Sequence, residues 1–323
     1  MSRHNIYKKS KKYFSRIKSV LLSDLKLPRW FKPKQPRYTL RAATRILFYK
    51  TKRLLRLDSS FYMPIESDMK IDLFMPTLEK DAKVLDICLE NAKIYIKHPI
   101  GNIYIVAPKN AKNVKKIADK HGCKFVDEDS ILPISKNEIS YVHNGEDRSG
   151  WIFKMLLNLS ADKVCKEKNI LILDADTVFI RPAIFMYKNK PIFNESPLFY
   201  RPYFDTNQRI FELKHPSSLS YITHYQLFQS DILKQLRIDI EKYNNKPWYE
   251  AIIDNLDTNE GSTFADYEIY ADYYIHRLNK PAIVNYWVVK DSGINGYDEF
   301  LLIKNKLSKK YGAVALHNYD RNE

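Results

Sequence analysis

Glycine is scarce in this chain, with 8 residues among 323. Phosphate-binding loops of the GxGxxG and GxxxxGKS/T types need glycine, because the backbone of such a loop approaches the phosphate closely. Neither pattern occurs in the sequence. Glycine-rich phosphate loops are therefore excluded as the ligand-binding device.

Cysteines and long apolar segments are also few. The three cysteines, Cys88, Cys123 and Cys165, are odd in number, and their spacing fits neither a disulfide framework nor a zinc site. The basic first residues are not followed by the apolar segment of a signal peptide, and no run of about 18 apolar residues occurs. We therefore expect a cytoplasmic protein without a secretion signal or a transmembrane helix.

Acidic residues are nearly missing from the first 60 residues. This segment holds 18 Lys and Arg against Asp24 and Asp58, for a net charge of +16. The other 263 residues hold 35 basic and 36 acidic side chains, for a net charge of −1. The excess charge thus belongs to one end of the chain. Because the remainder lacks the basic stripe of a nucleic-acid-binding domain, nucleic acid is not the expected partner.

The basic segment also carries apolar residues with helical spacing. Trp30, between Pro28 and Pro33, is of the residue type favoured at membrane interfaces. We expect residues 1–60 to bind an anionic membrane, placing the protein on the inner face of the plasma membrane as a peripheral protein. The alternatives are a flexible solubilising tail and a non-enzymatic nucleic-acid-binding arm. The apolar residues that share one helical face are Leu40, Ala43, Leu47, Leu54 and Leu57.

From residue 69 onward, strand and helix signals alternate. This order predicts an α/β fold, with a mostly parallel sheet and helices on both faces. We expect two parts, a basic helical arm over residues 1–68 and one α/β domain over residues 69–323. The expected strands are 71–75, 103–107, 124–127 and 170–173, and the expected helices are 82–98, 111–121 and 150–159.

Weaker signals continue the pattern in the second half of the chain. Aromatic and β-branched runs predict strands, and apolar residues with helical spacing predict helices. The expected strands are 198–203, 283–289 and 313–316, and the expected helices are 225–236, 264–278 and 297–309.

Acidic residues follow several of the expected strands. In parallel sheets, ligands bind outside the carboxyl ends of the strands. Asp174 and Asp176 follow the buried run 170–173, and Glu128-Asp129 follow the strand 124–127. Two carboxylates separated by one residue can bind Mg²⁺ or Mn²⁺, which in turn neutralises a diphosphate. The alternative is that Asp174 and Asp176 only begin a turn.

The segment Leu171-Ile-Leu-Asp-Ala-Asp-Thr-Val-Phe-Ile-Arg-Pro182, preceded by Arg148-Ser-Gly-Trp-Ile-Phe-Lys154, resembles GT-A-fold glycosyltransferases. The likeness is to bacterial families with a DxD motif that build surface polysaccharides such as lipopolysaccharide or capsule, and it covers residues 69–320. It implies a GT-A-like, Rossmann-like fold and a transferase that moves a sugar from a nucleoside diphosphate sugar to a glycan or lipid-linked acceptor.

The resemblance also implies roles for single residues. The metal, Mn²⁺ or Mg²⁺, would be bound by Asp174, Asp176 and a histidine near the carboxyl end, His317. Lys154 matches the position that contacts the diphosphate or sugar, where many members carry Gln. Thr77 and Asp81 fit the loop that holds the nucleotide base or ribose, and His224 is placed beside the donor sugar or acceptor. The donor-binding set is thus Thr77, Asp81, Arg148, Trp151, Lys154, Asp174 and His224.

The segment 262–270 resembles the later acidic motif of these enzymes, where a carboxylate faces the acceptor. If the reaction inverts the anomeric centre, Asp266 or Glu268 is the catalytic base that takes the proton of the acceptor hydroxyl. The alternative for Asp266 is a capping box with Thr263, in which the carboxylate only caps a helix.

Other enzyme classes fit the motif less well. Residues 174–178 match the nucleophile loop of haloacid-dehalogenase-like phosphatases, in which Asp174 would form an aspartyl phosphate and Asp176 would act as acid and base. That loop usually follows the first strand, whereas three strand-helix units precede it here, and its later Lys and GDxxxD partners are missing. A nucleotidyltransferase would carry a basic, glycine-rich loop after the first strand, and residues 76–81 are not one.

Overall fold

The computed structural model describes residues 36–55, 57, 66–196, 199–286, 289–290 and 296–316. The chain divides into two compact units, residues 1–61 and 62–323. Within the described part of the first unit, helix α2 (Pro36–Leu54) begins at a proline, which suits the first helical position. The remainder of the arm, with Trp30, lies outside the described residues. Among the helices that the structure describes, none is both long enough and apolar enough to cross a bilayer.

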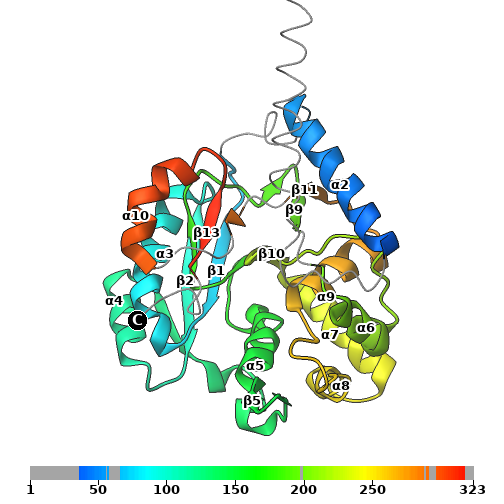
Figure 1. Cartoon of the computed structure of the whole chain (residues 1–323). Helices are drawn as coiled ribbons and strands as arrows, with labels where there is room; N and C mark the ends of the chain where they lie inside the picture. Colours follow the sequence, from blue (N-terminus) through cyan, green and yellow to red (C-terminus); the bar gives the residue numbers. More distant parts are fainter. Residues whose placement is uncertain are drawn as a thin grey trace, which may run out of the picture. The chain divides into compact units, whose positions relative to one another are not determined.

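A five-stranded sheet forms the centre of the second unit (Figure 1). Its order is β10-β6-β1-β2-β3, and only β10 runs antiparallel to its neighbour. The expected mostly parallel sheet is therefore confirmed. The strands are β1 (Ile71–Pro76), β2 (Ile100–Ala107), β3 (Lys124–Asp127), β6 (Asn169–Leu173) and β10 (Tyr225–Gln229).

Helices connect the parallel strands, as the sequence predicts. They are α3 (Ala82–Tyr95), α4 (Lys112–Lys120) and α5 (Ser149–Asn158). The short turns η2 (Glu79–Asp81), η3 (Glu128–Ser130), η4 (Lys136–Glu138) and η5 (Ala161–Lys163) and the hairpin β4 (Val142–His143) and β5 (Glu146–Asp147) complete these connections.

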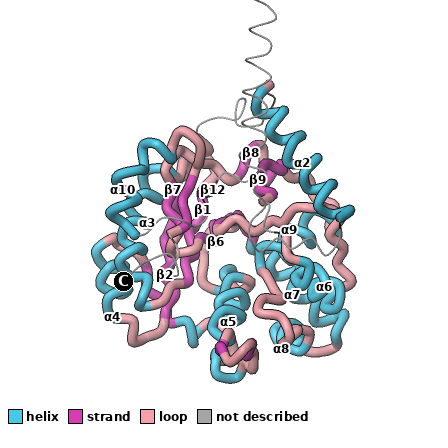
Figure 2. Tube along the Cα trace, in the orientation of Figure 1, coloured by secondary structure: helices cyan, strands magenta, loops and turns pink. Residues whose placement is uncertain are grey.

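Alternate residues of the central strands face two different hydrophobic cores. On β1, Phe74 packs into one core with residues of α5 and with Phe228 of β10. Leu73 and Met75 pack into the other core, with residues of α3 and α4. Figure 2 shows the magenta strands of this sheet with helices on either side. The fold is therefore an α/β sandwich with both faces of its sheet covered, and this confirms the expected layers.

Two of the predicted elements in the second half are wrong. The expected helix 225–236 begins as strand β10, which pairs with β6, and only from Ser230 does it become helix α7 (Ser230–Asn244). A short apolar run fits a strand or a helix equally well, and pairing with β6 decides between them. The expected strand 198–203 is instead the start of helix α6 (Arg201–Phe211). Pro202 lies in its first turn, where proline is well tolerated.

The remaining elements agree with the expected types. The long helix 264–278 is present as α9 (Asp266–Asp272), which continues as a π-helical turn, η6 (Tyr273–Arg277), and α8 (Trp248–Asp254) precedes it. Helix α10 (Gly296–Leu307) leads to β13 (Ala313–Ala315). Two small sheets have the orders β12-β13-β7 and β11-β9-β8, formed by β7 (Thr177–Phe179), β8 (Met186–Tyr187), β9 (Lys190–Glu195), β11 (Ile283–Tyr286), β12 (Val289–Lys290) and β13.

A buried carboxylate joins three segments at the amino ends of the parallel strands. Asp72 of β1 accepts hydrogen bonds from the backbone N–H of Asn102 at 2.7 Å, of Lys166 at 2.7 Å and of Glu167 at 2.9 Å. Gly101 makes room for it, because a Cβ atom at that position would lie 2.6 Å from Asp72 Oδ1. Asp72 therefore fixes β1, β2 and the segment before β6 relative to one another.

Candidate active site

The segment Asp174-Ala175-Asp176 lies at the carboxyl end of β6, where three parts of the chain meet. The N–H of Asp174 donates to the carbonyl of His224, just before β10, at 2.9 Å. The N–H of Leu316, just after β13, donates to the carbonyl of Asp176 at 2.8 Å. A turn follows Asp174, since the N–H of Thr177 donates to its carbonyl at 3.0 Å. The motif therefore forms a turn that is held on both sides by strand ends.

Side chains from helix α5, from helix α9 and from the segment just before β10 contact the Asp174 carboxylate. Lys154 Nζ of α5 lies 2.6 Å from Oδ1, and the Tyr267 hydroxyl of α9 donates to the same oxygen at 3.2 Å. His224 Nδ1 lies 3.3 Å from Oδ2. The Asp174 side chain is 13% exposed and that of Lys154 is 34% exposed, so the pair opens to solvent mainly on the lysine side.

The charges of this group stabilise one another. Burial acts to raise the pKa of Asp174, but Lys154 and then His224 outweigh burial and hold the pKa well below its ordinary value. Burial likewise acts to lower the pKa of Lys154, and the charge of Asp174, with a smaller contribution from Asp176, raises it instead. Both carboxylates of the motif therefore stabilise the charged form of one ammonium group, so their surroundings favour a positive charge.

Asp266 lies in the same part of the structure, buried at the first position of α9. Its Oδ2 accepts a hydrogen bond from Asn158 Nδ2 of α5 at 2.8 Å. Burial raises the pKa of Asp266 to about 7, since the nearby Lys154 only partly opposes it. The alternative of a capping box is not observed: the cap residue is Ala265, and no side-chain hydrogen bond caps the helix. The carboxylate is thus bound by an amide from another helix.

Glu268, the other expected base, belongs to a second buried group. Its Oε1 accepts hydrogen bonds from the Ser220 hydroxyl and, at 3.0 Å, from the N–H of Tyr221. Beside it, His215 Nδ1 lies 2.7 Å from Asp272 Oδ1, and Nε2 of the same ring lies 2.6 Å from the Leu219 carbonyl. Burial raises the pKa of Glu268 to about 7. The structure therefore brings Asp266, and not Glu268, together with the Asp174 group.

Helix α5 positions several of the expected residues along one face. Trp151, Lys154 and Asn158 follow one another at spacings of three and four residues, so their side chains share that face. The Arg148 guanidinium lies over the Trp151 ring, 5.2 Å from its centroid. Asn158 and Tyr267 were not among the residues predicted from the sequence. Their positions could have suggested them, because Asn158 lies one helical turn after Lys154 and Tyr267 follows Asp266 directly.

Thr77 lies at the carboxyl end of β1. Its N–H donates to the carbonyl of Val106 at 2.8 Å, and its hydroxyl is buried with no hydrogen-bond partner among the described residues. Asp81 precedes α3 and is half-buried. Buried hydroxyls normally have a partner, so Thr77 Oγ1 is suited to a ligand atom. The third expected metal ligand, His317, lies outside the described residues.

Within the part of the chain that the structure describes, two groups of carboxylate and histidine side chains are close enough to hold a metal ion. One is the group of His215, Glu268 and Asp272. Both ring nitrogens of His215 already face hydrogen-bond acceptors, and Asp272 raises the pKa of the ring to about 9 despite its burial. A doubly protonated imidazole has no lone pair for a metal.

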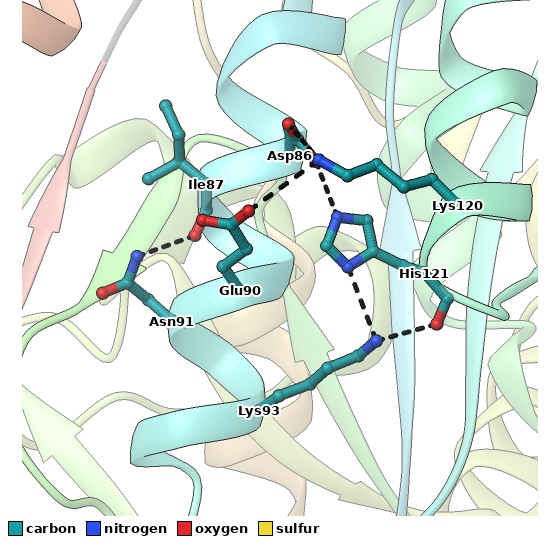
Figure 3. Close-up of polar contacts among 7 residues, drawn as sticks. All are labelled: Asp86, Ile87, Glu90, Asn91, Lys93, Lys120 and His121. Carbon is teal, nitrogen blue, oxygen red and sulfur yellow. Dashed lines mark hydrogen bonds and ion pairs between the residues drawn. The ribbon is translucent and has the colours of Figure 1, made fainter.

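The other group is Asp86, Glu90 and His121, between α3 and the end of α4 (Figure 3). Lys120 Nζ lies 2.7 Å from Asp86 Oδ1 and 3.8 Å from Glu90 Oε1. Lys93 Nζ lies 3.4 Å from His121 Nδ1. Two ammonium groups thus already supply the positive charge that a metal would bring, and the group acts as an ion network joining the two helices.

No curated protein matches the chain. Among solved structures, mouse xyloside xylosyltransferase 1 in its apo form is similar at 12% sequence identity and a TM-score of 0.43, over 78% of this chain and 99% of that chain. At this level the likeness does not bear on function. The model of the family described as "Family of unknown function (DUF6492)" matches residues 68–309. The chain belongs to this family.

Proposed function

We propose that this protein is a metal-dependent glycosyltransferase. It would transfer a sugar from a nucleoside diphosphate sugar to a glycan or lipid-linked acceptor in the synthesis of bacterial surface polysaccharides. One observation carries the proposal: the Asp174 carboxylate at the end of β6 faces Lys154 at 2.6 Å, with Asp176 acting on the same ammonium group and buried Asp266 near it. Such a group combines carboxylates that can bind a cation, an ammonium group that can bind a diphosphate, and a buried carboxylate that can act as a base.

The proposed metal ligands are Asp174, Asp176 and His317. The donor set fits Mn²⁺ or Mg²⁺, because carboxylate oxygens are hard ligands and the two carboxylates together already favour a cation beside them. When bound, the metal would lower the cost of the negative charge that develops on the leaving diphosphate.

The donor would lie along the carboxyl ends of β1 and β6. Lys154 can pair with a diphosphate oxygen, because its ammonium group is partly exposed and carries its charge at neutral pH. Thr77 Oγ1, which is buried without a partner among the described residues, suits the nucleoside, and Asp81 lies in the same loop region. His224, whose backbone and ring both contact Asp174, would lie beside the donor sugar.

Asp266 is the proposed base. A base works best when its pKa is close to the operating pH, and burial raises the pKa of this carboxyl to about 7. Asn158 holds Oδ2, which leaves Oδ1 to take the proton from the acceptor hydroxyl. Glu268 is fixed by Ser220 and Tyr221 in the second group, so we assign it a structural role.

The basic segment would place the enzyme at the inner face of the plasma membrane, where lipid-linked acceptors occur. On α2, Leu47, Phe48 and Leu54 are exposed, and basic residues such as Arg41 and Lys50 occur along the same helix. This combination of charge and exposed apolar side chains supports binding to anionic lipids.

A thermal-shift screen tests the proposed function. The protein is melted with UDP, GDP, CDP and their sugars, each with and without Mn²⁺. A ligand that binds only the native state raises the melting temperature, and we expect this for one nucleotide series, only with Mn²⁺, and not in Asp174→Asn. Asp86→Asn, which alters a carboxylate of the ion network in Figure 3, is the matched control and should keep the response.

Two results would contradict the proposal. Hydrolysis of the donor sugar at an unchanged rate in EDTA would rule out the metal-dependent mechanism. Cleavage of an aryl phosphate that is lost in Asp174→Asn would identify a phosphatase of the haloacid-dehalogenase type instead.

A further inference from the structure

Helix α5 carries Lys154 of the Asp174 group and also Trp151, which forms a cluster of half-buried aromatic rings with Tyr200 and Tyr203 at the start of α6. The ring centroids of Trp151 and Tyr203 are 6.4 Å apart, and those of Tyr200 and Tyr203 are 5.3 Å apart. We call these three residues the aromatic platform. Half-buried rings present both an apolar face and a polar edge, which suits ligands that combine C–H and hydroxyl groups.

The hydroxyl groups of the platform are held in place by the segment before α9. The Tyr200 hydroxyl donates to Glu260 Oε2 at 2.5 Å, and the Tyr203 hydroxyl lies 2.6 Å from Ser262 Oγ. Both rings therefore have fixed orientations. Residues from α5, α6 and the segment before α9 converge here, so the platform is an assembled surface and not a local feature of one helix.

Arg148, the cap residue at the start of α5, adds a positive charge beside the Trp151 ring. Its guanidinium lies over the Trp151 ring at 5.2 Å, and no carboxylate forms an ion pair with it among the described residues. Its Nε is buried and has no hydrogen-bond partner in the described part of the chain. A buried donor without a partner costs free energy, so its retention calls for an explanation. An anionic ligand group would satisfy it, because a guanidinium binds carboxylates and phosphates in bidentate geometry.

Short stretches of chain join the platform to the Asp174 group and to the proposed base. Trp151 precedes Lys154 by three residues on α5, which is about 4.5 Å along the helix axis. Ser262, the partner of Tyr203, precedes Asp266 by four residues. The platform is thus connected through α5 to the Asp174 group and through residues 262–266 to the proposed base.

We propose, resting on the proposed function, that Arg148 and the aromatic platform form an acceptor subsite for a sugar residue that carries an anionic group, either a carboxylate or a phosphate. Trp151 and Tyr203 bind the C–H face of the ring, and Arg148 binds the anionic group. Arg148 and Trp151, which the family resemblance places at the donor, would thereby belong to the acceptor subsite.

The test is saturation-transfer NMR on the full-length chain without nucleotide or metal. The probes are methyl glucuronide, glucose 6-phosphate and the neutral methyl glucoside. We expect saturation of at least one anionic probe, with binding at least about tenfold weaker for the neutral sugar and for the anionic probe in Arg148→Met, because a charge-assisted hydrogen bond is lost. The two anionic probes show which group, carboxylate or phosphate, the subsite takes.

Arg277→Met is the matched control, because the Arg277 guanidinium also lies over an aromatic ring, 4.6 Å from the centroid of Phe211, but lies on η6. It should bind the probes as the unaltered protein does. The proposal is overturned if no anionic probe binds, or if Arg148→Met binds it as well as Arg277→Met. Because nucleotide and Mn²⁺ are left out, this failure is distinguishable from failure of the proposed function, which the thermal-shift screen decides separately.

Discussion

Lys154 Nζ lies 2.6 Å from Asp174 Oδ1, so a lysine from the helix before the motif contacts the first carboxylate of the motif. The pair keeps Asp174 ionised, because Lys154 and His224 together outweigh the effect of burial on its pKa. An ionised carboxylate is the form that binds a divalent cation. Under the proposed function, the lysine would keep this carboxylate ready for a metal and would remain available, through its exposed side, for an anionic donor.

Replacing this lysine tests its part in donor binding. We expect Lys154→Gln to fold and to lose about 10- to 100-fold in kcat/KM for the donor, since the loss of one charge-assisted hydrogen bond costs about 1.5–3 kcal/mol. Steady-state kinetics at saturating Mn²⁺ measure the change. Lys120→Gln, which breaks the exposed ion pair with Asp86, is the control and should leave kcat/KM unaltered. Equal effects of the two changes would contradict the role of Lys154.

Asp266 and Glu268 are two residues apart but should respond differently to substitution. Asp266→Asn should lower kcat by at least about 100-fold, the usual contribution of a general base, and should leave a stable protein. Glu268→Gln should lower the melting temperature, because Glu268 binds Ser220 and Tyr221 inside the protein, with less effect on kcat per folded molecule. Activity assays normalised to the folded fraction distinguish them. Full activity in Asp266→Asn would exclude it as the base.

The raised pKa of Asp266 also predicts how stability depends on pH. The folded carboxyl has a pKa of about 7 against an ordinary 3.8, so between these values the folded state binds more protons than the unfolded state. The stability that this carboxyl group contributes to the folded state is therefore lost as the pH rises from the lower of these pKa values to the higher. Asp266→Asn removes the effect, so relative to the unaltered protein it should gain about 2 kcal/mol between about pH 5 and pH 8. Urea unfolding without metal gives both curves, and parallel curves would contradict the expected pKa.

Gly101 and Gly150 provide a matched pair of glycine substitutions. Gly101→Ala places a Cβ 2.6 Å from Asp72 Oδ1, and we expect a loss of about 1–3 kcal/mol from the displaced carboxylate. Gly150→Ala meets no atom within 4 Å on α5, and we expect a gain of up to about 1 kcal/mol. Chemical denaturation measures both. If Gly101→Ala left the free energy of unfolding unchanged, Asp72 would not be what fixes the strands at this end.

Deletion of residues 1–61 tests the membrane proposal. The full-length chain should co-sediment with anionic vesicles and should be released by salt, because Lys and Arg near an anionic surface contribute about 1 kcal/mol each and salt screens them. The shortened protein should remain in the supernatant. Neutral vesicles are the control for apolar binding alone. Equal partitioning of the two proteins onto anionic vesicles would contradict the membrane proposal.

The regular first half of the domain could be predicted from the sequence, and the contacts of the site only in part. The apolar runs of β1, β2, β3 and β6 are bounded by proline or polar residues, so their limits follow from local signals. By contrast, β10 is a strand because β6 pairs with it, and no local signal contains that partner. The different surroundings of Asp266 and Glu268 likewise depend on segments far away in the sequence.

The residues that contact one another in the site are separated by very different numbers of residues along the sequence. Lys154 and Asp174 are 20 residues apart, whereas Tyr267 contacts Asp174 across 93 residues and Asn158 contacts Asp266 across 108. Closing long loops costs more chain entropy and slows folding. A chain in which only the first strand-helix units have formed can thus hold the ion pair but still lacks Asp266, the proposed base. We therefore expect refolding molecules to form the Lys154–Asp174 pair before Asp266 reaches its place beside Asn158.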